Sequence, residues 1–429
     1  MNTSAHSLSG PPGLPRRSVL ALLLGTALSA CGGGGSPIAG VSSGGTGSFT
    51  SGSIVGFGSI IVNGVRYDDS LAKVADVDGT DHSNSNALKL GMVVAVQGSA
   101  TTVAQAGFNY TAEGTASQVV FVTELLGPVT NVVRDAQGQA QSFDILGQTV
   151  HWSSTTVFDG LSTTLGAVEQ GQFAEVYGFW DGEFWQASRV ETSSTAPAVY
   201  RLSGVVTAID TAAHTLTIGQ ETVSYAAVGL DAALGVGTSV RAVLNPNRVL
   251  AQPWAATAIR RADLQALPNV TSAELDGFEM ELEGIVSGVV GSRFTLQGLT
   301  VDGSALGAPI TNGQRVEVKG RFTQGVLIAQ SWESDEDSDR ERKGFELHGV
   351  VSALSANTFE LRGYSVTYDA STKGAQVLAN GIGVEVKLQL QANGSWYARE
   401  IESDENASAT GSGNDDGGEL EGVETSDGD

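Results

Sequence analysis

The feature that most constrains this chain is an internal repeat. A phrase in which a glycine precedes alternating valines, Gly-x-x-Val-x-Val, recurs along the sequence. The clearest copies are residues 91–98 and 313–320, and looser copies lie at 171–178, 237–243 and 381–387. Alternation of apolar and polar residues is the period of a strand with one buried face. A chain with five such units is expected to fold as a tandem array of small β domains.

Other signals surround each copy in a constant order. A glycine-led strand opens the unit, and a hairpin with a second glycine follows. A Val-x-aromatic strand comes next, as at residues 65–67, although the fourth unit departs from it at 301–303. After the repeated phrase, an Ala-x-x-apolar strand closes the unit. The connection before the phrase varies most, and only the first two units have room there for a short helix. Five strands with an insertion between the third and fourth predict an OB-like β-barrel, so the fold class is all-β.

These signals predict the domain organisation. The five barrel repeats are expected at residues 52–122, 123–196, 197–262, 280–334 and 345–404. The other segments are a signal peptide (1–30), a Gly/Ser-rich tether (31–51), a linker (263–279), an acidic linker (335–344) and a disordered acidic tail (405–429). A unit of about 60 residues buries only about 60% of its unfolded surface, so neighbouring barrels are expected to dock.

The N-terminal residues form an export signal. Arg16 and Arg17 precede an apolar run that ends at Ala30, which is too short to span a membrane. The segment 28–31 resembles the lipobox of bacterial lipoproteins, and the resemblance implies that Cys31 is lipidated and anchors the chain to a membrane. Gly32 stands where an inner-membrane retention signal would place Asp, which favours the outer membrane of a Gram-negative cell envelope. The alternative is a plain secretory signal with an incidental Cys.

Composition excludes several function classes. The chain has 23 Lys and Arg against 47 Asp and Glu, a formal net charge of −24, so no nucleic-acid partner is expected. A single Cys excludes a disulfide framework and a cysteine-based metal site. Four histidines, His82, His151, His214 and His348, fall in separate units, and solvated or singly hydrogen-bonded rings are expected. No phosphate loop or nucleophile elbow occurs, and the chain is not expected to be an enzyme.

The acidic segment between the fourth and fifth units is a candidate cation site. Glu333, Asp335, Asp337 and Asp339 offer hard oxygen ligands that could hold Ca²⁺. The segment lacks the glycine turn and distal glutamate of an EF-hand loop. The favoured alternative is therefore a solvated, self-repelling linker, and no cofactor is required.

Two tryptophans are candidates for ligand binding. Trp180 and Trp185 flank a predicted hairpin tip in the second unit, where two indole rings could stack on a sugar. Because strand alternation turns about half of such side chains inward, packing in the core is the favoured alternative.

Two segments of the first unit carry a family resemblance. Residues 56–67 and 88–98 resemble the signatures of the bacterial domain of unknown function 5666 family. The likeness is clearest in the first unit, fair in the fourth and fifth, and faint in the second and third. The resemblance implies lipoprotein-linked repeats of small β-barrel type. It implies no activity and no catalytic residues.

The sequence thus predicts a non-enzymatic, lipid-anchored envelope protein that acts as a binding or spacer scaffold. Its evidence is a set of five diverged units that share no polar constellation. Two alternatives stay open at this point. One is a carbohydrate-binding module that uses the tryptophans, and the other is a Ca²⁺-dependent adhesin. The sequence leaves open whether the partner is a protein or a glycan.

Overall fold

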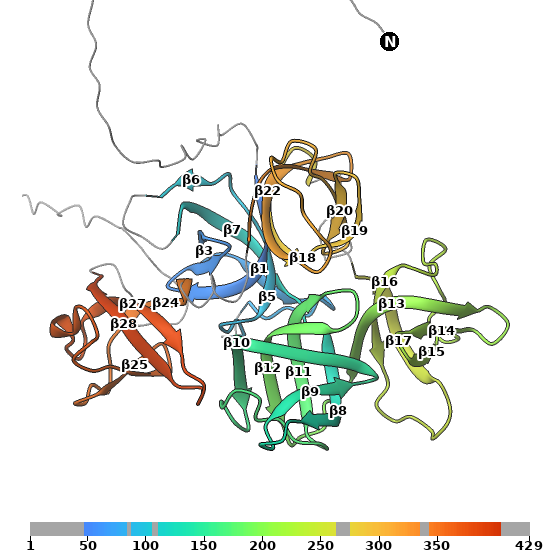
Figure 1. Cartoon of the computed structure of the whole chain (residues 1–429), viewed down its shortest axis with the longest axis horizontal. Helices are drawn as coiled ribbons and strands as arrows, with labels where there is room; N and C mark the ends of the chain where they lie inside the picture. Colours follow the sequence, from blue (N-terminus) through green and yellow to red (C-terminus); the bar gives the residue numbers. More distant parts are fainter. Residues whose placement is uncertain (1–46, 84–86, 105–109, 263–274, 335–342, 405–429) are drawn as a thin grey trace, which may run out of the picture. The chain divides into compact units, whose positions relative to one another are not determined.

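The computed structural model describes residues 47–83, 87–104, 110–262, 275–334 and 343–404. Within these ranges the secondary structure consists of β-strands and one short 3-10 turn, η2 (Ala375–Val377). No helix in the described part of the chain is long and apolar enough to span a membrane. The strands form small five-stranded barrels in tandem, which confirms the predicted fold class (Figure 1).

The strands group by repeat in chain order. Repeat 1 contains β1 (Ser48–Phe57), β2 (Ile60–Val62), β3 (Val65–Asp68), β4 (Lys73–Asp76), β5 (Val93–Gly98), β6 (Thr102–Val103) and β7 (Ala112–Phe121). Repeat 2 contains β8 (Leu125–Arg134), β9 (Ala140–Ile145), β10 (Gln148–Gly160), β11 (Phe173–Trp180) and β12 (Trp185–Ser193). Repeat 3 contains β13 (Tyr200–Asp210), β14 (Thr215–Ile218), β15 (Glu221–Ser224), β16 (Ser239–Leu244) and β17 (Trp254–Arg261).

The last two repeats follow the same plan. Repeat 4 contains β18 (Glu279–Ile285), β19 (Ser287–Val290), β20 (Arg293–Leu296), β21 (Leu299–Asp302), β22 (Arg315–Thr323) and β23 (Val326–Ser334). Repeat 5 contains β24 (Phe345–Val350), β25 (Thr358–Leu361), β26 (Tyr364–Thr367), β27 (Gly383–Leu390) and β28 (Trp396–Ser403).

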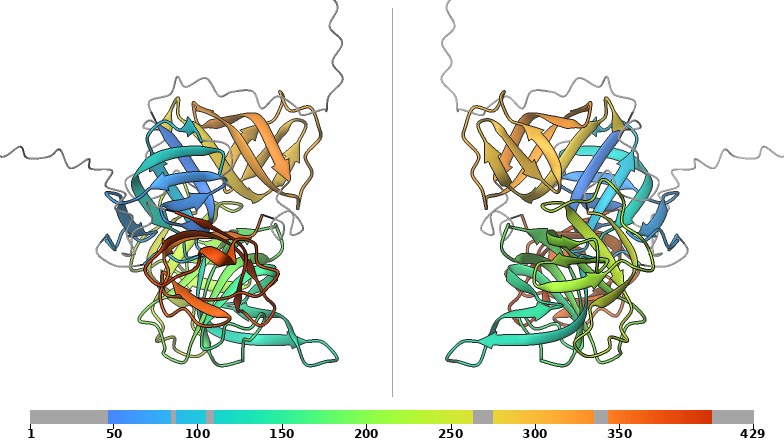
Figure 2. Two further views of the ribbon diagram at one scale, coloured as in Figure 1. Left: turned by 90° about the vertical axis from the view of Figure 1, so that its left-hand side faces the viewer. Right: turned by 90° about the vertical axis from the view of Figure 1, so that its right-hand side faces the viewer.

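Each repeat closes its sheet in the same order. In repeat 3, β13 pairs with β14, β14 with β15, β15 with β17, β17 with β16, and β16 again with β13. The β15–β17 pair is parallel, and the other four pairs are antiparallel. This closed five-stranded order is the OB-like barrel that the sequence predicts. Figure 2 shows strands β18–β23 of repeat 4 crossing around such a barrel.

The repeated glycine–valine phrase builds the barrel cores. Its two valines point inward from the fourth strand of the barrel, since side chains alternate between the faces of a strand. In repeats 1, 4 and 5 these valines are fully buried: Val94, Val96, Val316, Val318, Val384 and Val386. The residue between each pair of valines therefore lies on the opposite face of the strand, outside the barrel core.

The first strands of the repeats pair with one another. β1 pairs in parallel with β18 along residues 48–51, and farther along it pairs in parallel with β24 at Gly56 and Phe57. β8 and β13 pair in antiparallel fashion at Leu125 and Leu126. A Cβ at Gly56 would lie 2.9 Å from the carbonyl oxygen of Glu346, so glycine is what lets the two backbones meet. These pairs satisfy strand edges that separate barrels would leave open.

Two sequence expectations differ from the structure. β1 begins at Ser48, so the segment assigned to the tether ends inside a strand whose polar residues pair with β5 and β18.

The connections of repeats 1 and 2 carry no helix in their described residues. Repeat 1 has the short strand β4 there, and in repeat 2 the third strand, β10, is 13 residues long. The parallel pairs of β4 with β7 and of β10 with β12 use the extra residues as strand.

A buried arginine joins repeats 1 and 2. Arg189 on β12 is 1% exposed, donates from Nη1 to the carbonyl oxygen of Leu90 at 3.1 Å, and forms ion pairs with Asp159 and Glu191. Lys89 also pairs with Glu191 at 2.9 Å. Burial opposes ionisation of both acids, but these cations outweigh it and lower the pKa of Asp159 and of Glu191 below their ordinary values. The joint is therefore held by partly exposed carboxylates that compensate the charge of one buried guanidinium.

Replacing Arg189 with methionine is expected to lower the free energy of unfolding by about 1–2 kcal/mol at pH 7. The guanidinium is buried, but the side chains of Asp159 and Glu191 are 40% and 31% exposed, so water screens part of the interaction. As the pH falls through the lowered pKa values of Asp159 and Glu191, the two carboxylates are protonated. The stabilisation is then lost, and the difference between wild type and variant shrinks. Urea denaturation at pH 7 and pH 3 measures both effects.

Lys89→Met is the matched control for this prediction. Its side chain is 37% exposed, and an exposed pair contributes only about 0–1 kcal/mol. A difference for Arg189→Met that is equally large at both pH values would contradict the assigned role of the two carboxylates.

Candidate functional site

In repeats 3, 4 and 5, three positions place polar side chains on the face of the barrel opposite its core. Two lie on the first strand, three residues and one residue before the opening glycine. The third lies between the two valines of the repeated phrase. In repeat 5 these positions hold Glu346, His348 and Glu385, and in the β24–β27 register His348 stands directly opposite Glu385. In repeat 4 the same positions hold Glu281, Glu283 and Glu317.

In repeat 5 these side chains converge on the imidazole ring of His348. Its Nε2 lies 2.7 Å from Oε1 of Glu346, and its Nδ1 lies 3.0 Å from Oδ2 of Asp404. One ligand atom each of Glu346, His348 and Glu385 lie within 4.8 Å of one another. All three residues are buried, with between 3% and 6% of their surface exposed. The cluster thus gathers carboxylates around one ring away from solvent.

The electrostatics of this cluster favour positive charge at its centre. Burial alone would lower the pKa of His348, but hydrogen bonds to Asp404 and Glu346 outweigh it and raise the pKa to about 9. Burial and the nearby charge of Glu346 raise the pKa of Glu385 to about 7. Both shifts have one physical cause, which is several carboxylates sharing a single cation in a poorly hydrated site.

Repeat 1 covers the cluster. Gly58 follows the end of β1, has a φ of 118°, and packs so closely that a Cβ there would lie 2.2 Å from Cβ of His348. The Gly-Phe-Gly segment of repeat 1, residues 56–58, therefore fits against β24 because two of its residues lack side chains.

In repeat 4 the corresponding cluster is partly balanced by two basic side chains, Arg315 and Lys319. Glu283 accepts hydrogen bonds from the backbone N–H of Ser53 at 2.8 Å and from Nε of Arg315 at 3.2 Å. Lys319 forms an ion pair with Glu281 and lies 3.5 Å from Oε1 of Glu317. Burial and the neighbouring Glu281 raise the pKa of Glu317 well above its ordinary value. Carboxylates therefore exceed the cations that can balance them here.

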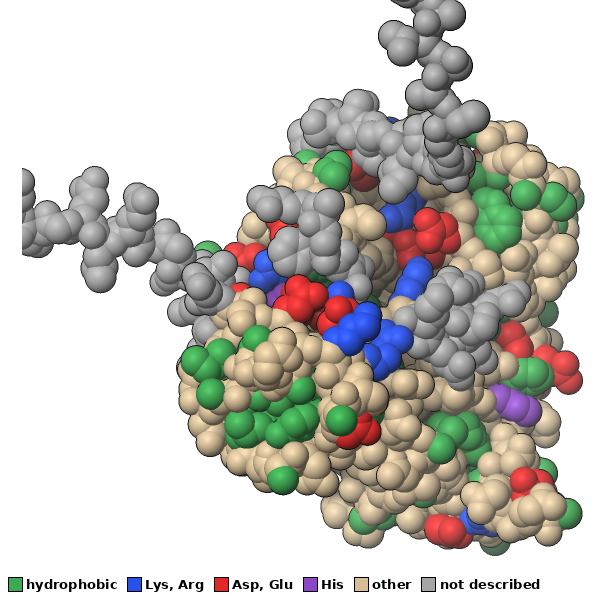
Figure 3. All heavy atoms as spheres, turned by 60° about the vertical axis from the view of Figure 1, so that its left-hand side comes forward, with side chains coloured by type: hydrophobic (Ala, Val, Ile, Leu, Met, Phe, Trp, Pro, Cys, Tyr) green, Lys and Arg blue, Asp and Glu red, His purple; other side chains and the backbone are tan. Residues whose placement is uncertain are grey.

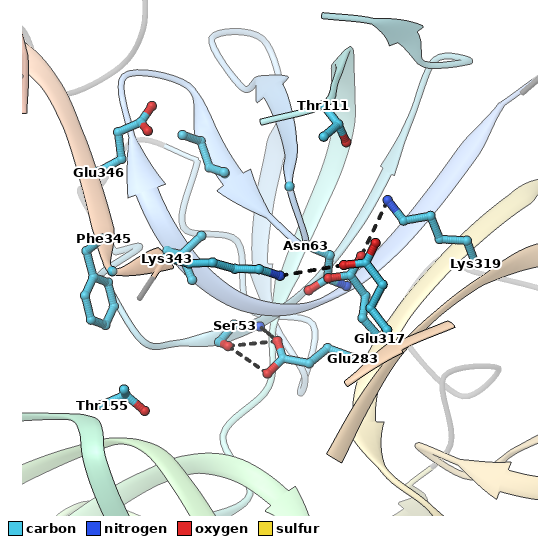
Figure 4. A pocket seen from close by; sticks show the side chains of 15 residues that line it. Ser53, Asn63, Thr111, Thr155, Glu283, Glu317, Lys319, Lys343, Phe345 and Glu346 are labelled. Carbon is cyan, nitrogen blue, oxygen red and sulfur yellow. Dashed lines mark hydrogen bonds and ion pairs between the residues drawn. The ribbon is translucent and has the colours of Figure 1, made fainter. Parts of the chain in front are cut away.

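A cavity lies where residues of several repeats meet (Figure 4). Its volume is about 230 Å³. Four of its lining residues are acidic and two are basic: Glu283, Glu317, Glu333, Glu346, Lys319 and Lys343. Val55, Ile61 and Phe345 give it an apolar wall. Figure 3 shows a face of the molecule on which acidic and basic side chains gather around a hollow.

The two tryptophans of the predicted aromatic site lie close together in repeat 2. Trp185 is 6% exposed and belongs to the core that repeats 2 and 3 share, where its ring lies 5.6 Å from that of Trp180. Trp180 is partly buried and packs against the same core. Both tryptophans also line a cavity of about 120 Å³, so ligand binding at Trp180 and Trp185 stays a prediction beside the alternative of core packing.

The predicted cation site falls mostly outside the described residues. The structure does not describe Asp335, Asp337 and Asp339, and the lipidation candidate Cys31 also lies outside the described residues. Glu333 ends near the cavity, and one of its oxygens lies 4.0 Å from Nζ of Lys343. Its near partner is thus an ammonium group, and the Ca²⁺ site of the acidic linker stays a prediction.

The residues that converge in repeats 4 and 5 are not brought together by the sequence alone. The sequence predicts an isolated ring for His348, because Glu385 and Asp404 lie far along the chain. The available signal is positional: in repeats 3, 4 and 5, polar residues stand just before the opening glycine and between the paired inward residues of the repeated phrase. Recognising the cluster also required knowing that these two strands pair in register.

Comparison with protein families supports the repeat assignment. The model of the Domain of unknown function (DUF5666) matches residues 127–191, 283–331 and 348–402, so the chain carries repeated copies of this domain. The matched regions are repeats 2, 4 and 5. The sequence predicts repeat 1 as the clearest copy, but the matched regions do not include it. They do include repeat 2, for which only a faint likeness is expected.

Two further comparisons add no functional information. The search of curated proteins gives no match. A solved structure titled "drosophila Unr CSD456" matches with 13% identity and a TM-score of 0.13, covering 48% of this chain and 98% of that chain. A likeness at this TM-score carries no argument about the fold or the function.

Gly58→Ala tests the close packing of repeat 1 on His348. The added methyl group would overlap the histidine, so the variant is expected to lose about 1–3 kcal/mol of unfolding free energy relative to a control. Gly138→Ala is that control, because Gly138 also has a positive φ, 82°, but has nothing within 4 Å of its Cβ position. Equal losses in the two variants, measured by chemical denaturation, would contradict the contact.

Proposed function

We propose that this protein is a non-enzymatic, lipid-anchored scaffold of the bacterial cell envelope that binds a small organic cation in the cavity between its repeats. The observation that carries the proposal is that four carboxylates and only two ammonium groups line that cavity, and that three of the carboxylates, Glu283, Glu317 and Glu346, are buried. The paired first strands support it, because they hold lining residues of different repeats together. The lipobox resemblance at Cys31 supports the anchor.

The charge balance of the cavity favours a cationic ligand. Lys319 is shared between Glu281 and Glu317, and Lys343 faces Glu333. The raised pKa of Glu317, caused first by burial and then by Glu281, means that its charged form lacks a sufficient partner. An ammonium group from a ligand would supply that charge where water screens it weakly.

The remaining walls limit the ligand's size and shape. A cavity of about 230 Å³ lies below the range of about 300–1,000 Å³ that is usual for ligand pockets. Val55, Ile61 and Phe345 suit a short hydrocarbon chain, and Asn63 and Thr111 offer polar side chains nearby. A short aliphatic amine meets these requirements.

The ligand class is tested by calorimetric titration of the full chain with 1,5-diaminopentane and with uncharged 1,5-pentanediol. The diamine is expected to bind and the diol is not. Glu317→Gln is expected to weaken diamine binding about tenfold, or about 1.4 kcal/mol. The amide mimics the protonated carboxyl that the raised pKa favours, so folding should be retained.

Glu169→Gln is the control for this titration. It removes a carboxylate whose side chain is 68% exposed and which lies outside the cavity lining. Binding of the diol as strongly as the diamine, or unchanged binding by Glu317→Gln, would contradict the cationic-ligand proposal.

The anchor is tested separately by replacing Cys31 with serine. Without its thiol the chain cannot carry an acyl group, and it is expected to move from the membrane fraction to the soluble fraction of the cell envelope. Membrane association that persists in the Cys31→Ser variant would contradict lipidation at this residue. This result is independent of ligand binding.

A further inference from the structure

We propose that Glu346, His348 and Glu385 form a binding site for one divalent transition-metal ion of the zinc class. The site lies in repeat 5, on the barrel face opposite the core. It shares Glu346 with the lining of the proposed amine site, but its test does not depend on that proposal. Its ligand atoms come from β24 and β27, two paired strands that fix their separation.

A carboxylate next to the other ring nitrogen of His348 suits metal binding by this residue. Metal-bound imidazoles usually donate their other ring N–H to a carboxylate, which orients the ring and makes the ligand more basic. Here Asp404 lies 3.0 Å from Nδ1, which leaves Nε2 on the side of Glu346. Arg362 further fixes this strand by donating to the backbone carbonyl of His348 at 2.5 Å.

An unpartnered oxygen points independently to a missing cation. Glu346 is 3% exposed, and its Oε2 is sealed from solvent without a hydrogen-bond partner in the described part of the chain. Buried carboxylate oxygens are expensive to leave unpaired. A metal ion bound to the carboxylate would offset that cost. The existing contact with His348 does not, because it is made by Oε1 and leaves Oε2 unpaired.

Comparison with repeat 4 explains why repeat 5 has this deficit. At the same position on the fourth strand, Lys319 contacts two of the three acids of its own cluster. In repeat 5 the equivalent Lys387 instead pairs with Glu400 at 3.3 Å and Glu402 at 3.8 Å on β28. In repeat 4 a lysine therefore supplies positive charge to the cluster, whereas in repeat 5 the equivalent lysine pairs with acids outside the cluster.

The donor set selects the kind of ion. Imidazole nitrogen suits Zn²⁺, Cu²⁺, Ni²⁺ and Fe²⁺, whereas Ca²⁺ and Mg²⁺ prefer sites built from oxygen alone. One imidazole with two carboxylates is a set that Zn²⁺ accepts in tetrahedral sites, with a further position for water. Glu346 also lines the cavity, which offers the ion a route to the buried cluster.

The test is a calorimetric titration of the untagged, metal-stripped full chain with ZnCl₂. One tight site per chain is expected in the wild type. His348→Gln is expected to weaken it at least 100-fold, and Asp404→Asn about 10–100-fold through loss of ring orientation. Glu175→Gln is the matched control, because Glu175 occupies the position of Glu385 in repeat 2 and bonds Thr123 and Tyr177 instead.

X-ray absorption of the zinc-loaded wild type keeps the proposal testable if a variant fails to fold. One imidazole and otherwise oxygen ligands are expected in the first shell. Three results would overturn the proposal: no tight uptake of Zn²⁺ by the wild type, a first shell without imidazole, or unchanged affinity in a folded His348→Gln variant. The first of these would mean that a proton on His348 alone supplies the positive charge.

Discussion

The pairing of first strands between repeats is the constraint on which the rest of this structure depends. A barrel of about 60 residues is only marginally able to bury its own core, and the first strand of such a unit has an edge that can accept another strand. In this chain β1 accepts both β18 and β24, and β8 accepts β13. Glycines at the contacts, Gly56 above all, allow the backbones to approach. The repeats are thus joined by the same hydrogen bonds that build a sheet.

Buried charge follows from this pairing. When strands of two repeats meet, side chains that would be solvated on a single barrel become buried and need partners of opposite charge. The joints meet that need with different ion pairs. Arg189 pairs with Asp159 between repeats 1 and 2, and Arg241 pairs with Glu124 at 2.9 Å between repeats 2 and 3. In repeat 4, Lys319 and Arg315 pair with glutamates of the cluster. Repeat 5 relies on His348. Diverged repeats therefore share one architecture while their off-core positions carry different chemistry.

The barrels could be predicted from sequence because their signals are local. Alternating valines, paired glycines and the closing Ala-x-x-apolar strand specify strands and turns within one unit, and the resemblance is confirmed in three of the repeats. Contacts between units could not be predicted in this way. Residues 48–51 are polar and small, which is typical of a tether, yet they form a strand because β18 pairs with them. Trp185 is part of the core for a related reason, since alternation alone cannot say which face of a strand is covered.

The central claim is tested most directly by hydrogen–deuterium exchange on the intact chain. The decisive amides are those in residues 48–51 and 279–282 that face the neighbouring repeat. If β1 and β18 pair as described, these amides exchange as slowly as the alternate amides of the same strands, which bond within their own barrels. Exchange at the rate of an exposed strand edge, with protection kept inside each barrel, would contradict the account. The repeats would then be independent units, and the clusters between them would lose their structural basis.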